Sequence, residues 1–131
     1  MQSRRSFILS SLLVVGGAAT GVYFYKSSTE SKEELAVNGV INQLADLPGA
    51  IRFGKILRKQ ASGKTFTDSL KSISERLQNN YGEFSYENIG AVLEQQIQKE
   101  FRLNQFQLVD GWYLSRTEAE LCLLASMVSK A

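Results

Sequence analysis

Near its end, the chain reads Leu108-Val109-Asp110-Gly111-Trp112-Tyr113-Leu114-Ser115-Arg116-Thr117-Glu118-Ala119-Glu120-Leu121-Cys122. An Asp-Gly pair between apolar residues is typical of a two-residue β-hairpin turn, because both central positions of that turn take a positive φ. We therefore expect Asp110 and Gly111 at the tip of a hairpin. Its strands would run from Phe106 to Val109 and from Trp112 to Leu114.

A capping box follows the hairpin. In the pattern Ser115-x-x-Glu118, the serine oxygen accepts a backbone N–H of the first helical turn, and the glutamate accepts the serine's own N–H. The pattern predicts that a last helix begins after Ser115. Apolar residues at helical spacing predict one buried stripe on that helix, formed by Ala119, Cys122, Leu123 and Ser126. Structural roles are therefore expected for Asp110, Gly111, Ser115 and Glu118.

Two adjacent aromatic residues follow the turn. A strand directs neighbouring side chains to opposite faces, so one of Trp112 and Tyr113 is expected in the core and the other outside. Tryptophan is expected inside, which leaves Tyr113 exposed near Arg116 and Arg102. Aromatic side chains and arginine are enriched at protein interfaces. The candidate partner interface therefore consists of Trp112, Tyr113 and Arg116.

The run from Val109 to Cys122 also carries a resemblance. Written Val-Asp-Gly-Trp-x-Leu-Ser-x-Thr-Glu-Ala-x-Leu-Cys, it resembles the C-terminal signature of a family of small, functionally uncharacterised proteins with a twin-arginine signal. The likeness extends to residues 51–57 and to the N-terminal segment. Proteins of this kind are associated with large flavin-dependent dehydrogenases as small accessory subunits. The resemblance thus implies a partner and names no chemistry of the chain's own.

The N-terminal segment predicts export. Two adjacent arginines with Phe-Ile behind them are similar to the twin-arginine signal, although Leu9 stands where that signal usually has lysine. An ordinary secretory signal is the alternative, because any export signal begins with a basic region. The residues of the candidate export signal, which the twin-arginine translocase would read, are Ser3, Arg4, Arg5, Phe7 and Ile8.

Residues 7–25 contain 19 positions without a charge. At about 1.5 Å per residue, such a helix approaches the ~30 Å hydrocarbon core of a bilayer. We expect an uncleaved anchor in the inner membrane with the body in the periplasm; cleavage after Ala19, which would release a soluble periplasmic protein, is the alternative. The predicted organisation is a signal or anchor over residues 1–26, a linker over 27–32 and a small domain over 33–131.

The domain is expected to be mainly α-helical. Five helices and one short hairpin before the last helix account for the pattern of apolar residues. Polar residues predict where three of the helices begin: Ser31, in a capping box with Glu34, then Thr67, and then Ser85. No internal repeat or low-complexity region interrupts the domain.

Composition excludes several kinds of site. The chain has no histidine and a single cysteine, Cys122, so the usual zinc sites, catalytic triads and an internal disulfide are excluded. Cys122 is expected to be a buried apolar group, with a disulfide to a partner as the alternative.

After residue 26 the chain carries 12 of its 15 basic residues and all 13 acidic ones, a net charge of −1. This near-neutral body argues against nucleic-acid binding, and no cofactor, metal or catalytic residue is predicted.

Two functions from different classes remain. The first is a non-catalytic exported accessory subunit that escorts or membrane-anchors a larger periplasmic oxidoreductase, which the resemblance implies is flavin-dependent. The twin-arginine route exports proteins that are already folded, often with a cofactor in place, whereas this body offers no cofactor site of its own. A small protein on that route is therefore expected to escort or anchor a partner that carries the cofactor. The second is a stand-alone membrane-anchored structural or binding domain, exported by the general secretory pathway.

Overall fold

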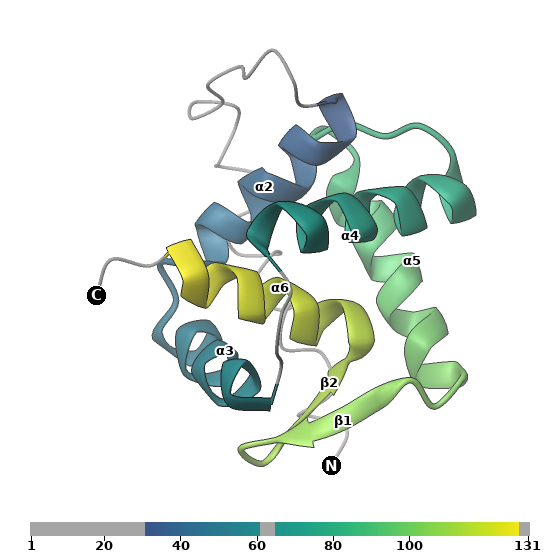
Figure 1. Ribbon diagram of the computed structural model, residues 1–131. Coiled ribbons are helices and arrows are strands. Elements are labelled where there is room, and N and C mark those ends of the chain that lie inside the picture. Colours follow the sequence, from purple (N-terminus) through teal and green to yellow (C-terminus); the bar gives the residue numbers. More distant parts are fainter. Residues whose placement is uncertain (1–30, 61–64, 129–131) are drawn as a thin grey trace.

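The computed structural model describes residues 31–60 and 65–128. Within these ranges the chain forms five helices and one antiparallel hairpin, which confirms the mainly helical fold with a hairpin before the last helix (Figure 1). In chain order the elements are α2 (Lys32–Leu44), α3 (Pro48–Gln60), α4 (Phe66–Tyr81), α5 (Ile89–Arg102), β1 (Phe106–Val109), β2 (Trp112–Ser115) and α6 (Arg116–Val128).

Ser31 caps α2, the first helix within the described ranges. Its hydroxyl accepts the N–H of Glu34 at 3.1 Å, and the Glu34 carboxylate accepts the Ser31 N–H at 3.3 Å, so the predicted capping box is present. Ser31 and Lys32 were expected in the linker over 27–32, but they cap and open α2. The predicted signal or anchor over residues 1–26 lies outside the described ranges. Among the helices within those ranges, none has both the length and the apolar character needed to cross a membrane.

Two predicted helix starts are wrong by a few residues. Thr65, not Thr67, caps α4, because its hydroxyl accepts the N–H of Asp68 at 3.0 Å. Ser85 does not cap α5. It opens a turn closed by the bond from the Asn88 N–H to the Ser85 carbonyl, and the helix begins only after that turn. In both cases several cap-forming side chains stand close together, and a sequence pattern does not rank them.

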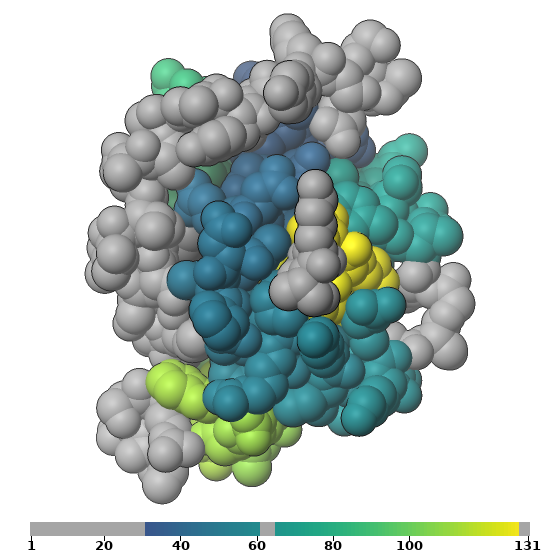
Figure 2. All heavy atoms as spheres, turned by 90° about the vertical axis from the view of Figure 1, so that its left-hand side faces the viewer, coloured from purple at the N-terminus to yellow at the C-terminus, as the bar shows by residue number. Residues whose placement is uncertain are grey.

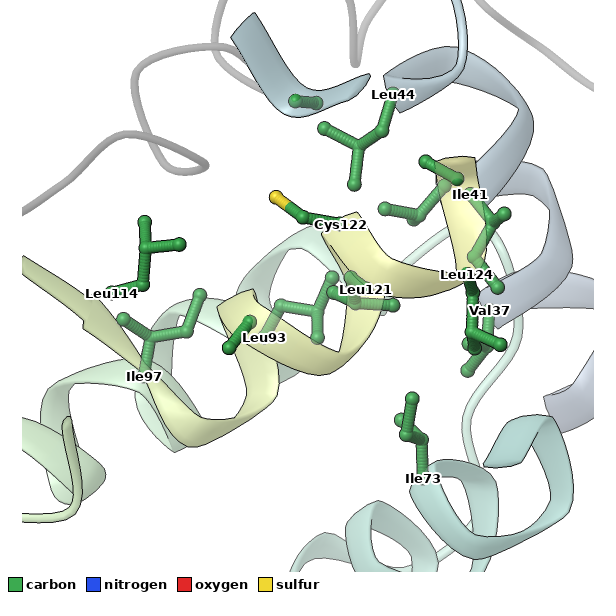
Figure 3. Close-up of a cluster of buried hydrophobic side chains, with 14 of the residues drawn as sticks. Val37, Ile41, Leu44, Ile73, Leu93, Ile97, Leu114, Leu121, Cys122 and Leu124 are labelled. Atoms are coloured by element: carbon green, nitrogen blue, oxygen red, sulfur yellow. The ribbon is translucent and has the colours of Figure 1, made fainter. Parts of the chain in front are cut away.

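The last helix, α6, lies at the centre of the body. Figure 1 shows it between α3 and α4, with α2 above and the hairpin below. The expectation of a single buried stripe is wrong: Leu123 is only half-buried, while buried residues lie on several sides of the helix, at Ala119, Leu121, Cys122, Leu124 and Ala125. A helix that is apolar nearly all round is one that other elements surround. Figure 3 shows the side chains that α2, α4, α5 and β2 contribute around it.

Helix α3 approaches α6 closely at Gly54. A Cβ at this position would lie 2.6 Å from the Cβ of Ser126 and 2.8 Å from its hydroxyl oxygen, and it would collide with the Cys122 carbonyl. The missing side chain therefore allows the two helix backbones to meet. Figure 2 shows the outer side of α3, in blue, with the yellow-green hairpin below it.

Candidate interaction surface

The hairpin has the geometry that the sequence predicts. Asp110 and Gly111 have φ values of 52° and 84°, the two positive values that the tight turn requires. The register pairs Val109 with Trp112, Leu108 with Tyr113 and Phe106 with Ser115. Partners in an antiparallel pair share a face, and faces alternate along a strand. Phe106, Leu108 and Tyr113 therefore lie on one face of the hairpin.

This face carries an exposed apolar cluster, which we call the hairpin patch: Phe106, Leu108 and Tyr113. Leu108 is 61% exposed and Phe106 is 38% exposed, whereas Tyr113 is half-buried. The Phe106 ring meets the Tyr113 ring edge-on, with 5.6 Å between centroids, and lies 5.4 Å from the ring of Phe101 on α5. Exposed apolar groups held together in this way are typical of an interaction site.

The opposite face of the hairpin packs on the body. Val109 and Leu114 are buried there. Trp112 is half-buried, and its ring centroid lies 6.3 Å from that of Phe53 on α3. Trp112 and Tyr113 thus lie on opposite faces. Trp112 joins the hairpin to α3, so the structure places it beside the core and away from the hairpin patch.

Two charged residues of the motif form ion pairs, one with another element and one within α6. Asp110 at the turn pairs with Arg52 of α3, with 3.0 Å between Nε and Oδ2. Arg116 instead lies 3.7 Å from the Glu120 carboxylate, one turn further along α6. Each pair includes an exposed arginine side chain, so each contributes little stability. The Asp110 pair nevertheless links the turn of the hairpin to α3.

The first turn of α6 holds two buried carboxylates. Glu118 accepts the Ser115 N–H at 2.8 Å, and the Ser115 hydroxyl accepts the Glu118 N–H at 3.1 Å, which is the predicted capping box. Glu100 of α5 accepts the N–H of Thr117 at 2.7 Å and its hydroxyl at 2.6 Å. Negative charge is favoured at a helix N-terminus. Both carboxylates therefore hold the start of α6 in place.

Glu100 belongs to a polar network that sequence reasoning missed. It accepts a bond from the Gln96 amide at 2.7 Å, and Gln96 accepts one from Asn80 of α4 at 3.0 Å. On the other side of Thr117, Arg76 of α4 binds the threonine hydroxyl and pairs with Glu120. A signal was present, since Gln96 and Glu100 fall on the same side of α5 as Leu93 and Phe101. The network connects α4, α5 and α6.

Burial raises the pKa of two groups in the body. The Cys122 thiol is fully buried, and burial followed by the negative charge of Glu118 raises its pKa well above the usual range. Burial is also the main reason that the pKa of Tyr81 is raised, with the charge of Glu100 acting in the same direction. A protonated, buried Cys122 fits the expected apolar role, and its position inside the body leaves no access for a partner disulfide.

No cluster of three or more acidic or cysteine side chains within residues 31–60 and 65–128 could hold a metal ion. The candidate export residues Ser3, Arg4, Arg5, Phe7 and Ile8 lie outside the described ranges. No family model, curated protein or solved structure matches the chain. The hairpin patch is therefore the strongest candidate for a functional surface in the part of the chain that the structure describes.

Proposed function

We propose that this protein is a non-catalytic accessory subunit that binds a larger, periplasmic oxidoreductase through the hairpin patch. The observation that carries the proposal is the exposure of Leu108 and Phe106 beside Tyr113, on a hairpin that is fixed to the body on its other face. An apolar patch on a rigid support loses little conformational entropy when a partner covers it.

The surroundings of the patch suit a protein partner. Arg102 and Arg116 are exposed and lie at the end of the hairpin where Phe106 pairs with Ser115. An apolar centre with arginine at its rim is the usual composition of a binding surface between proteins. A partner with apolar and acidic side chains would complement it.

The buried carboxylates of the first turn of α6 support a non-catalytic role. Glu100 and Glu118 are both fully buried and are both engaged by backbone N–H groups of that turn. A catalytic acid or base must reach a substrate proton. These groups stabilise a helix start instead.

The proposal also includes export of the chain and its attachment to the inner membrane. Arg4 and Arg5 would direct the chain to the twin-arginine translocase, and residues 7–25 would tether the body to the periplasmic side of the inner membrane. The resemblance of residues 109–122 to accessory proteins of flavin-dependent dehydrogenases favours a flavin enzyme as the partner. A neighbouring dehydrogenase gene without its own export signal would point to the same arrangement.

The test is recovery of the partner from membranes in mild detergent, with the native neighbouring genes expressed. Leu108→Ala, Tyr113→Ala and Arg116→Glu should each reduce recovery of the oxidoreductase several-fold without lowering the melting temperature much. Tyr86→Ala removes an exposed aromatic ring outside the hairpin patch and is the matched control. Trp112→Ala should mainly destabilise the fold. If the wild-type protein is always recovered alone, the chain is instead a stand-alone domain at the membrane.

A further inference from the structure

Strand β1 has one edge that β2 does not use. Val109 and Trp112 flank the two-residue turn, so they form a hydrogen-bonded pair, and the pairs alternate from there along the strand. The bond from the Arg116 N–H to the Gln105 carbonyl, 3.0 Å long, continues this alternation. The backbone N–H and C=O groups of Phe106 and Leu108 therefore point away from β2. In the described ranges, β1 pairs with β2 alone (Figure 1).

Apart from its length of four residues, this edge lacks the features that usually prevent strands from pairing. Natural edge strands carry charges, prolines or bulges, or they are covered by another element. Residues 103–109 contain no charge and no proline, and β1 has a regular register without a bulge. Phe106, Gln107 and Leu108 are all exposed. The edge is therefore able to accept another strand.

We propose that β1 pairs antiparallel with β1 of a second copy of this chain, about a two-fold axis at Gln107. In this register Phe106 of each copy lies opposite Leu108 of the other. These are the two residues whose backbone groups point outward, so each pair exchanges both of its N–H···O bonds. The two hairpins become one continuous sheet, and the two hairpin patches become one apolar face.

The edge is self-complementary, which favours a second copy over a strand of another protein. An isologous contact requires that the same surface fit itself across the axis. Gln107 meets its own counterpart there, and its exposed amide can both donate and accept a hydrogen bond. Antiparallel pairing also brings the end of each strand near Arg102 toward the turn at Asp110 of the other copy. Opposite charges therefore approach one another at both ends of the contact.

Cysteine cross-linking tests the register. Gln107→Cys places two thiols in a directly opposed pair without backbone hydrogen bonds, where Cβ atoms lie about 4.5–5.5 Å apart, near the spacing of a disulfide. Under mild oxidation of the full chain in its membrane, this variant should be recovered mostly as a disulfide-linked dimer. Gln105 is also exposed but lies opposite residue 109, so Gln105→Cys should stay monomeric. The native Cys122 is buried and does not interfere.

A charge at the axis tests the association itself. Gln107→Lys brings two like charges directly opposite one another, which destabilises an antiparallel pair. In sedimentation of the full chain in mild detergent, it should raise the dissociation constant of the dimer at least tenfold, whereas Gln105→Lys should change it little. Equal cross-linking at 105 and 107, or a wild-type chain that sediments as a monomer throughout, would overturn the dimer. Recovery of the oxidoreductase is a separate measurement, so the proposed function would stand or fall independently.

Discussion

Gly54 of α3 and Ser126 of α6 lie so close together that a Cβ on the glycine would be 2.6 Å from the Cβ of the serine. The Cys122 carbonyl on α6 adds a backbone atom to the same contact. A flexible side chain could move aside, but a backbone carbonyl inside a helix cannot move without displacing its helix. The distance between α3 and α6 therefore depends on a glycine at position 54.

Gly54→Ala should lower the free energy of unfolding by at least about 2 kcal/mol, because overpacking a tight contact costs about 1–3 kcal/mol and this contact includes backbone. Urea denaturation followed by circular dichroism measures the change. Gly90→Ala is the matched control, since a Cβ there meets no atom within 4 Å. The control should be neutral or slightly stabilising, as alanine is the better helix former. Equal effects of the two substitutions would show that the helices separate easily.

Glu100→Ala should cost about 3 kcal/mol of unfolding free energy. The change leaves the N–H and hydroxyl of Thr117 and the amide of Gln96 without their acceptor, and each buried unsatisfied group costs about 1–3 kcal/mol. Glu100→Gln retains an acceptor and should cost less. Glu94→Ala, at an exposed position on the same helix, should fall within about 0.5 kcal/mol of the wild type. A loss at Glu100 no larger than at Glu94 would mean that the network adds no stability.

Ser115→Ala should lower the unfolding free energy by about 1 kcal/mol, the usual cost of losing a helix cap. Chemical denaturation measures it, with Ser31→Ala as the comparison at an exposed capping box. Ser115 is fully buried, so its substitution should cost more than that of Ser31. An unchanged unfolding midpoint together with loss of the partner would assign Ser115 to recognition instead.

Cys122 should not react with a water-soluble disulfide reagent at pH 8 while the protein is folded. Burial raises the pKa of this thiol, so the reactive thiolate is absent from the native state throughout the neutral range. Because the folded state holds the proton more tightly, stability should be constant below the unfolded pKa of about 8.5 and should fall as the pH rises above it, where the thiol of the unfolded chain ionises and the buried thiol does not. Absorbance assays with and without denaturant make the comparison. Rapid labelling of the folded protein would contradict the burial.

Replacing both Arg4 and Arg5 by lysine should retain the protein in the cytoplasm. The change preserves the charge but removes the paired guanidinium groups, which lysine does not replace at a specific recognition site. Cell fractionation measures the outcome, and substitution of Lys26 by arginine serves as a control outside the pair. Normal export of the double lysine variant would identify an ordinary secretory signal.

Local patterns predicted local structure well. The Asp110-Gly111 turn and the box of Ser115 with Glu118 involve residues at most three apart, so their geometry follows from backbone preferences and nearby hydrogen bonds. The predicted cap at Thr67 failed because Thr65 occupies the cap position of α4, and the one at Ser85 failed because the chain makes a turn from Ser85 to Asn88 before α5 begins. Which of two adjacent caps is used depends on the packing of the helix that follows.

Contacts between residues far apart in the chain could not be predicted from local sequence patterns. The partner of Asp110 is Arg52 on α3, and Glu100 meets Thr117 only because α5 and α6 pack together. Sequence spacing gives the face of a helix but not the neighbour of that face. The same limit explains why α6 was expected to have a single buried stripe. Its position became clear only once four helices and the hairpin had been placed around it.

The central place of α6 also constrains synthesis of the protein. Helices α2 to α5 leave the ribosome before residues 116–128, yet each of them packs against the helix that those residues form. The nascent chain consequently has no complete core until this segment has been translated and released from the exit tunnel. Until then its apolar faces are available to chaperones, and on the export route proposed above, which accepts only folded cargo, the translocase would have to wait for translation to pass residue 128.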